Sequence, residues 1–223
     1  MYGGRVQTHK DRRDGETRSM TPVHKTPRVL ATDRNAATID VDVWVVPHGL
    51  KVALPADIDR ATDGELTRAA TRGEFTGAAF ETTIARLTGW KARYVLLVGT
   101  GEAGEPTPGT LRRAATVGVL AARGRKLSRV GVIVPTVSAE QRPRVVQSIV
   151  EGAIAANYDG GAYKTTATSR AWADEVVVRV ETVDRAVSDA AERGRVLGEC
   201  TNVTRELANL SGNVLTPRAF TAR

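Results

Sequence analysis

The chain has 223 residues, of which 41% are hydrophobic and 26% charged, and its formal net charge is +7. No apolar run approaches the roughly 18 residues that span a bilayer, so we expect no membrane segment. The first 20 residues lack the apolar stretch of a secretion signal, and the single cysteine, Cys200, excludes an internal disulfide. Together these features predict a cytoplasmic protein that is long enough for one domain with appendages.

The amino-terminal segment is basic and lacks hydrophobic periodicity. Residues 1–28 contain seven Lys or Arg and three Asp or Glu, so they contribute more than half of the net charge. Such a composition predicts disorder, and we expect a disordered basic tail over residues 1–35. A basic tail raises the affinity for phosphate backbones, which leaves weak nucleic-acid binding open. Translation could start at Met1 or at Met20.

The pattern changes at residue 38. The stretch TIDVDVWVV alternates apolar and polar residues, which predicts a strand with Asp40, Asp42 and Trp44 on its polar face. LKVALP then predicts a second short strand. DRATDGELTRAATRGEF predicts one helix, followed by a loop through Gly73 and Gly77.

Strands and helices alternate over the rest of the chain. The predicted strands are 93–99, 129–135 and 174–181, and the predicted helices are 110–124 and 138–157. A final helix of about 25 residues begins near Val183. Its apolar stripe comprises Val183, Val187, Ala190, Leu197, Cys200, Thr204 and Leu207. Gly194 and Gly198 should weaken this helix. Strands separated by helices predict an α/β domain with a parallel or mixed sheet.

One glycine-rich loop resembles a dinucleotide-binding turn. YVLLVGTGEAG contains Gly99, Gly101 and Gly104 in GxGxxG spacing directly after a strand. However, Glu102 and Glu105 would place carboxylates where phosphates bind, and two prolines delay the following helix. The next strand also lacks the acidic residue that would bind a ribose. We therefore predict that these glycines only make the strand-to-helix connection flexible in conformation, and that no nucleotide binds there.

From the sequence, no residue is assigned as catalytic, cofactor-binding or metal-binding. His9 and His24 fall in the predicted tail and His48 in a turn, without metal-ligand spacing. Asp40 and Asp42 could chelate a cation, but an exposed strand face with two carboxylates is the more common explanation. Cys200 is predicted to be a buried structural thiol. A group of basic residues on predicted helices is expected to be a solvated face: Arg112, Arg113, Arg123, Arg125, Lys126 and Arg129.

Four stretches together resemble the leucyl (cytosol) aminopeptidases, which are two-metal exopeptidases. TRAATRGEFTGAAFETT (67–83), RYVLLVGTGE (93–102) with TLRRAA (110–115), and EGAIAANYDGGAYKT (151–165) are similar to the amino-terminal domain of that family. TRELANLSGNVLTP (204–217) resembles its linker helix and the entry into the catalytic domain. The matching positions are Arg205, Leu207, Asn209, Asn213, Leu215, Thr216 and Pro217, whereas Leu210-Ser211 replaces a Thr-Pro pair.

The resemblance implies a macro-domain-like layered α/β fold, with a mixed, mostly parallel sheet flanked by helices and followed by a long linker helix. It divides the chain into the tail (1–35), the amino-terminal domain (36–182), the linker helix (183–210) and the start of a truncated catalytic domain (211–223). In the family, the ligands of two divalent ions (Mn or Zn) and the catalytic Lys and Arg follow the NVLTP junction. None of those motifs occurs in this sequence.

The resemblance therefore implies an inactive fragment, truncation or frameshifted product of a leucyl aminopeptidase. Peptide substrate would be reached only through the missing catalytic domain, and the family forms homo-hexamers. A macro-like module that binds a nucleotide, ADP-ribose or DNA is the alternative.

Overall fold

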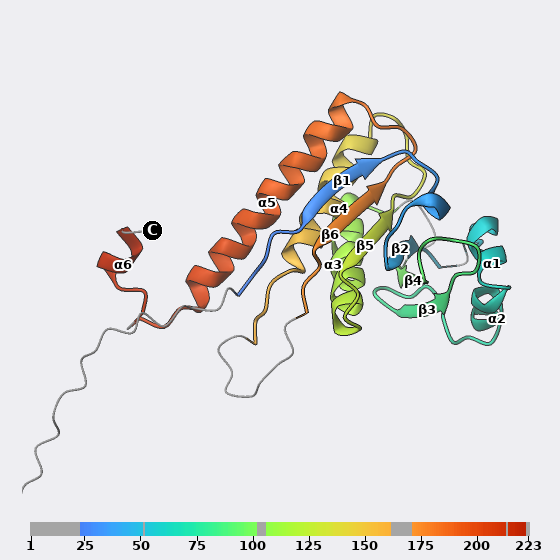
Figure 1. The fold of residues 1–223 in the computed structure, drawn as a ribbon, viewed down its shortest axis with the longest axis horizontal. Coiled ribbons are helices and arrows are strands. Elements are labelled where there is room, and N and C mark those ends of the chain that lie inside the picture. Colours follow the sequence, from blue (N-terminus) through green and yellow to red (C-terminus); the bar gives the residue numbers. More distant parts are fainter. Residues whose placement is uncertain (1–22, 51, 102–105, 162–170, 213, 222–223) are drawn as a thin grey trace, which may run out of the picture.

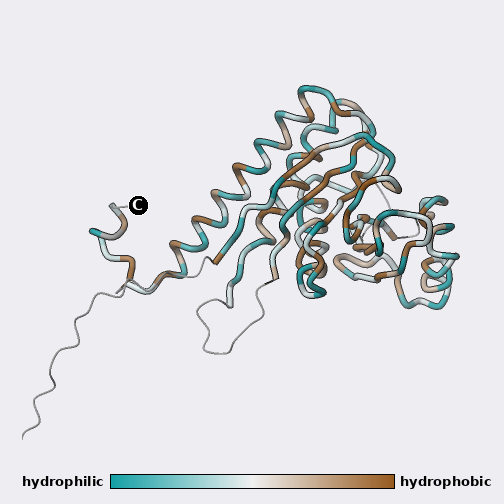
Figure 2. The backbone as a smooth tube through the Cα atoms, in the orientation of Figure 1, coloured by the Kyte–Doolittle hydropathy of each residue, from teal (hydrophilic) through white to brown (hydrophobic). Residues whose placement is uncertain are grey.

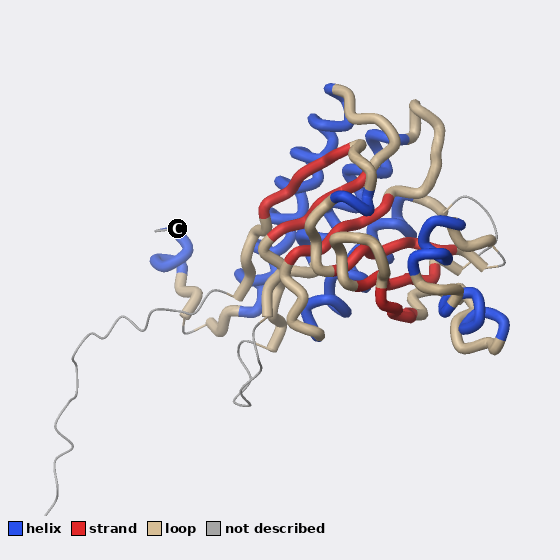
Figure 3. Tube along the Cα trace, turned by 45° about the vertical axis from the view of Figure 1, so that its right-hand side comes forward, coloured by secondary structure: helices blue, strands red, loops and turns tan. Residues whose placement is uncertain are grey.

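The fold is an α/β layered structure, seen in a computed structural model that describes residues 23–50, 52–101, 106–161, 171–212 and 214–221. Its six-stranded sheet has the order β1-β6-β5-β2-β4-β3, with helices on both faces (Figures 1 and 3). Neighbouring strands are parallel except β3 and β4, which are antiparallel. The strands are β1 (Arg28–Thr32), β2 (Val43–His48), β3 (Thr82–Arg86), β4 (Tyr94–Gly99), β5 (Arg129–Ile133) and β6 (Glu175–Arg179).

Three long helices cover one face of the sheet: α3 (Pro108–Gly124), α4 (Arg142–Ala155) and α5 (Arg185–Asn209). Their apolar stripes pack on the strands and form the larger core cluster, which includes Val43 and Val45 of β2. Figure 2 shows the apolar residues concentrated along the strands. The predicted α/β class, the mixed and mostly parallel sheet and the long final helix are all confirmed.

A second, smaller core lies on the opposite face, under η1 (Ala36–Thr38), α1 (Ala56–Ala61) and α2 (Glu65–Thr71). Trp44 and Val46 of β2 point into it. Every residue of β2 is therefore buried, and the prediction that Trp44 lies on a polar strand face is wrong. A strand covered on both faces needs no polar face, as in other parallel sheets. The short helix α6 (Pro217–Thr221) lies apart from the sheet (Figure 1).

Several short elements differ from the sequence prediction. Residues 28–32 belong to the sheet as β1, paired with β6, so the predicted tail extends too far; residues 1–22 lie outside the described part. The described residues of LKVALP form no strand, and the single helix predicted before Gly73 is two helices, α1 and α2. The edge strand β3 was not predicted.

The glycines of α5 are packing positions. A Cβ on Gly194 would lie 2.5 Å from the carbonyl oxygen of Gln147, and one on Gly198 would lie 2.6 Å from the Cβ of Ile154. Both contacts are with α4, so these glycines let the two helices approach closely. The buried side of α5 thus runs through Gly194, Gly198 and Asn202, while Cys200 is exposed. The prediction of a buried thiol is wrong, because Cys200 lies on another side of the helix.

Candidate functional site

A cavity of about 720 Å³ opens at the carboxyl ends of the parallel strands. The connection after β2 passes over one face of the sheet through α1 and α2, and the connection after β4 passes over the other through α3. Where connections diverge in this way, the carboxyl ends of neighbouring strands are left uncovered, which is the usual ligand position in open α/β sheets. The volume lies within the range of small-molecule sites.

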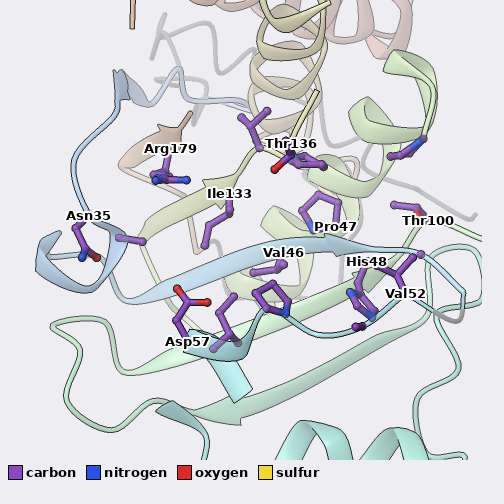
Figure 4. Close-up of a pocket in the computed structure, with 18 of the residues that line it drawn as sticks. Asn35, Val46, Pro47, His48, Val52, Asp57, Thr100, Ile133, Thr136 and Arg179 are labelled. Atoms are coloured by element: carbon purple, nitrogen blue, oxygen red, sulfur yellow. The ribbon is translucent and has the colours of Figure 1, made fainter. Parts of the chain in front are cut away.

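The cavity combines apolar walls with a few polar groups (Figure 4). Val46 and Ile133 come from the ends of β2 and β5, and Ile58 comes from α1. The polar lining residues are Asp33, Asn35, His48, Asp57, Thr100, Thr136 and Arg179. Figure 4 shows Arg179, Asn35 and Asp57 toward one end of the cavity and His48 with Thr100 toward the other.

His48 is the last residue of β2 and is 8% exposed. Burial lowers the pKa of its imidazole, and a hydrogen bond with the backbone of Val52 only partly opposes this effect. Its ring centroid lies 6.0 Å from that of Phe75. Since the ordinary histidine pKa is about 6.5, the ring is neutral at pH 7. His48 therefore lines the cavity with an uncharged imidazole that can donate or accept a hydrogen bond.

Arg179 is the last residue of β6, and its backbone carbonyl accepts a hydrogen bond from the N–H of Val134. This bond joins the end of β6 to the chain just after β5 and fixes where the side chain begins. The Nε atom of Arg179 is buried, and within the described part of the chain it has no hydrogen-bond partner. Buried donors are nearly always hydrogen-bonded in folded proteins, so Arg179 requires a particular explanation.

The opposite, amino-terminal edge of the sheet contains the aspartates considered as cation ligands. The Asp42 carboxylate accepts hydrogen bonds from the N–H groups of Ser128 (3.0 Å) and Arg129 (2.9 Å), and it lies 3.3 Å from a guanidinium nitrogen of Arg93. Asp40 accepts two hydrogen bonds from the Arg129 guanidinium, at 2.5 and 3.0 Å. Both precede β2 rather than lying within it. Their oxygens face donors and positive charge, so this donor set does not fit a metal ion.

The pKa of Asp42 reflects the same arrangement. Burial by itself raises this pKa, but the backbone hydrogen bonds from Arg129 and Ser128, with the charges of Arg129 and Arg93, outweigh burial and lower it. Among the residues that the structure describes, no group of three or more His, Cys, Asp or Glu could hold a metal ion.

The first two glycines of the GxGxxG stretch pack against a crossing loop. A Cβ on Gly99 would collide with the carbonyl oxygen of Ala78, and the N–H of Gly101 donates to the carbonyl of Gly77. Glu81 closes this loop by accepting the N–H groups of Thr76, Gly77 and Ala78. The glycines thus serve chain packing. Gly104 and the two glutamates of the motif lie outside the described residues.

The basic residues predicted on helices do not form one common face. Arg112 pairs with Glu151 at 2.9 Å, and Arg129 binds Asp40. Arg123 donates to the carbonyls of Ala156, Tyr158 and Ala171, and its guanidinium lies 4.8 Å from the Trp172 ring centroid. These three arginines therefore bind other parts of the protein.

The sequence predicts His48 in a turn, whereas it ends β2, and neither Arg179 nor Asp57 is predicted from the sequence as a site residue. A signal for Arg179 was present, because a charged residue directly follows the buried run Val176–Val178. His24 is also not in a free tail. It forms a β-bridge with Tyr158, and its Nδ1 lies 3.3 Å from a carboxylate oxygen of Glu206 on α5.

Comparison with known proteins places these features in context. A family model described as "Cytosol aminopeptidase family, N-terminal domain" matches residues 44–167. A probable cytosol aminopeptidase of Roseiflexus castenholzii is 28% identical over 201 residues, covering 88% of this chain and 39% of that protein. One of Acidobacterium capsulatum is 30% identical over 161 residues, covering 71% and 32%. The chain thus spans less than half the length of these relatives.

Solved structures support the fold. A mutant of tomato leucine aminopeptidase superposes with a TM-score of 0.75 at 15% identity, covering 91% of this chain and 42% of that one. The bottromycin maturation enzyme BotP in complex with Mn gives a TM-score of 0.62 at 22% identity, covering 82% and 35%. No helix in the described ranges is long and apolar enough to cross a membrane.

Proposed function

Because the chain belongs to the cytosol aminopeptidase family and contains its N-terminal domain, we propose that it is the non-catalytic accessory domain of a leucyl aminopeptidase. The observation that supports this most strongly is the extent of the match. The family model that fits residues 44–167 describes the N-terminal domain, and the Roseiflexus castenholzii relative matches 88% of this chain with only 39% of its own length.

We further propose that hydrolysis of peptides, with its two divalent ions, belongs to the part of the relatives that this chain does not span. Asp40 and Asp42 support this assignment, since their carboxylate oxygens already bind arginines and backbone N–H groups. Two metal ions would stabilise the oxyanion and supply hydroxide during peptide hydrolysis. The cavity at the carboxyl edge is accordingly assigned to binding and not to the hydrolytic step.

Hydrolysis of Leu-p-nitroanilide tests this proposal. The purified 223-residue chain, with Mn²⁺ or Zn²⁺ added, should release p-nitroaniline no faster than a sample from cells without the gene taken through the same columns. Metal-dependent release that co-elutes with the chain in size-exclusion chromatography would show that the chain is itself a peptidase.

Assembly can be tested on the same material. The hexamer implied by the resemblance is proposed to require the remainder of the family's chain, so light scattering should give a mass near the monomer value of 23.8 kDa. A mass six times larger would show that this chain contains sufficient subunit contacts.

A further inference from the structure

The cavity at the carboxyl edge is lined by charged side chains of both signs that have no partner among the residues the structure describes. The Nε atom of Arg179 is buried and unbonded. Asp33 and Asp57 are exposed residues that line the same cavity, and neither side chain forms an ion pair or hydrogen bond with any described residue. The largely buried carboxylate of Asp42, in contrast, accepts hydrogen bonds from two backbone N–H groups. A buried donor without a hydrogen bond costs stability, and a ligand that accepts a hydrogen bond from the Arg179 Nε would offset that cost.

The charges specify the chemistry of such a ligand. A guanidinium presents a planar fork of donors that matches a carboxylate. The carboxylate of Asp57, at the first turn of α1, can accept hydrogen bonds from an ammonium group. Val46, Ile58 and Ile133 supply an apolar wall of the same cavity. A carboxylate, an ammonium group and an apolar side chain together describe a zwitterionic amino acid.

The two aspartates disfavour the competing phosphate ligands. A phosphate monoester has a charge of about −1.5 to −2 at neutral pH, and it would enter a cavity whose lining includes two carboxylates and one guanidinium. Burial lowers the pKa of His48, so this residue adds no positive charge that would compensate at pH 7. A zwitterion, in contrast, brings no net charge and can bind groups of both signs.

We propose that this cavity binds a free α-amino acid with an apolar side chain, such as leucine. Its carboxylate binds Arg179, its ammonium group binds Asp57, and its side chain packs against Val46 and Ile133. A free amino acid is also the product of an aminopeptidase, so occupancy of the cavity would report the product concentration. That regulatory role alone rests on the proposed function, whereas the binding site rests on the lining residues.

Isothermal titration of the 223-residue chain with L-leucine tests the assignment. We expect saturable binding with a Kd between about 1 μM and 1 mM. L-leucine amide lacks the carboxylate and 4-methylpentanoate lacks the ammonium group, so each should bind at least about 10-fold more weakly. Inorganic phosphate should give no saturable heat. Absence of leucine binding, or equal affinity for 4-methylpentanoate, would overturn the amino-acid assignment, and saturable binding of phosphate would do the same.

Variants locate the bound leucine. Arg179→Met and Asp57→Asn should each weaken leucine binding by about 10-fold or more. Arg86→Met, on edge strand β3, and Asp189→Asn, on α5, are charge-matched controls and should bind as the unmodified chain does. Leucine binding unchanged in both cavity variants would place the amino acid elsewhere and refute the proposal. Because Asp57 is exposed, the Asp57→Asn variant should fold. It therefore still tests the proposal if the Arg179→Met variant fails to fold.

This experiment is independent of catalysis. A chain that binds leucine without hydrolysing Leu-p-nitroanilide agrees with both proposals. Hydrolysis by a chain that binds leucine would overturn the proposed function alone, and a chain with neither property would overturn the amino-acid site alone.

Discussion

The two edges of the sheet differ in whether their charged side chains have partners within the described part of the protein. At the amino-terminal edge, Asp42 and Asp40 are paired with Arg129 and Arg93 and with backbone N–H groups that lead into β5. At the carboxyl edge, Arg179 and Asp57 line one cavity and are unpaired among the described residues. Charges at the first edge hold strands together, whereas those at the second remain available to a ligand. The same residue types thus have different roles according to which end of a parallel strand they occupy.

The largest effect is expected at the paired edge. Asp42→Ala removes the acceptor of two backbone N–H groups and the partner of two arginines, and the Asp42 side chain is only 12% exposed. Loss of one partner of a largely buried pair leaves unsatisfied groups behind, so we expect the free energy of unfolding to fall by about 3 kcal/mol. Urea denaturation measures this change.

Asp40→Ala is the control for that variant, since the Asp40 side chain is 61% exposed and should contribute less than about 1 kcal/mol. Equal losses in the two variants would show that burial of Asp42 is not the cause.

A smaller loss is expected from Gly99→Ala at the carboxyl end of β4. The new methyl group would meet the backbone of Ala78 and Gly77, which cannot move as a side chain could. Such overpacking should cost about 2 kcal/mol. Gly124→Ala, with no atom within 4 Å of the added Cβ, should leave stability unchanged or raise it slightly. If Gly99→Ala were also neutral in thermal unfolding, the glycine would not be required by chain packing.

The two edges should also respond to pH in separate ranges. The lowered pKa of Asp42 means that its contribution is complete above the unfolded value, about 3.9, and is lost as the pH falls through the folded value. The lowered pKa of His48 means that the unfolded chain binds a proton first, so stability declines as the pH falls below about 6.5.

Melting temperatures measured from pH 8 to pH 3 separate these contributions. His48→Gln should flatten the decline that begins near pH 6.5, and Asp42→Asn should flatten the one at lower pH. A His48 variant whose pH profile equals that of the unmodified chain would show that this ring titrates normally.

The long periodic elements were predictable because their packing is decided locally. α3, α4 and β4 follow helical or continuous apolar patterns, and the structure confirms them near the predicted ends. Neither β1 nor β3 is predicted, and both are five-residue edge strands. The partner of β1 is β6, which is distant in sequence, and β3 is only partly buried. Their strand character depends on the neighbouring strand rather than on their own pattern.

The candidate cavity could not be predicted from the sequence, for a related reason. Arg179, Asp57 and His48 come from β6, α1 and β2, and only the strand order β6-β5-β2 brings them to one edge. The glycines of α5 show the same dependence. In sequence Gly194 weakens a helix, but in the structure it lies against α4 where no Cβ would fit. Local patterns predict elements, whereas sites and close contacts depend on how those elements are assembled.

The most direct test of the contrast between the two edges is the melting temperature of Arg179→Met with and without L-leucine. If Arg179 serves a ligand, the free variant melts at the same temperature as the unmodified chain or slightly higher, and leucine no longer raises it. A variant that melts several degrees lower, yet is stabilised by leucine as the unmodified chain is, would show that Arg179 holds the fold together and does not bind the amino acid.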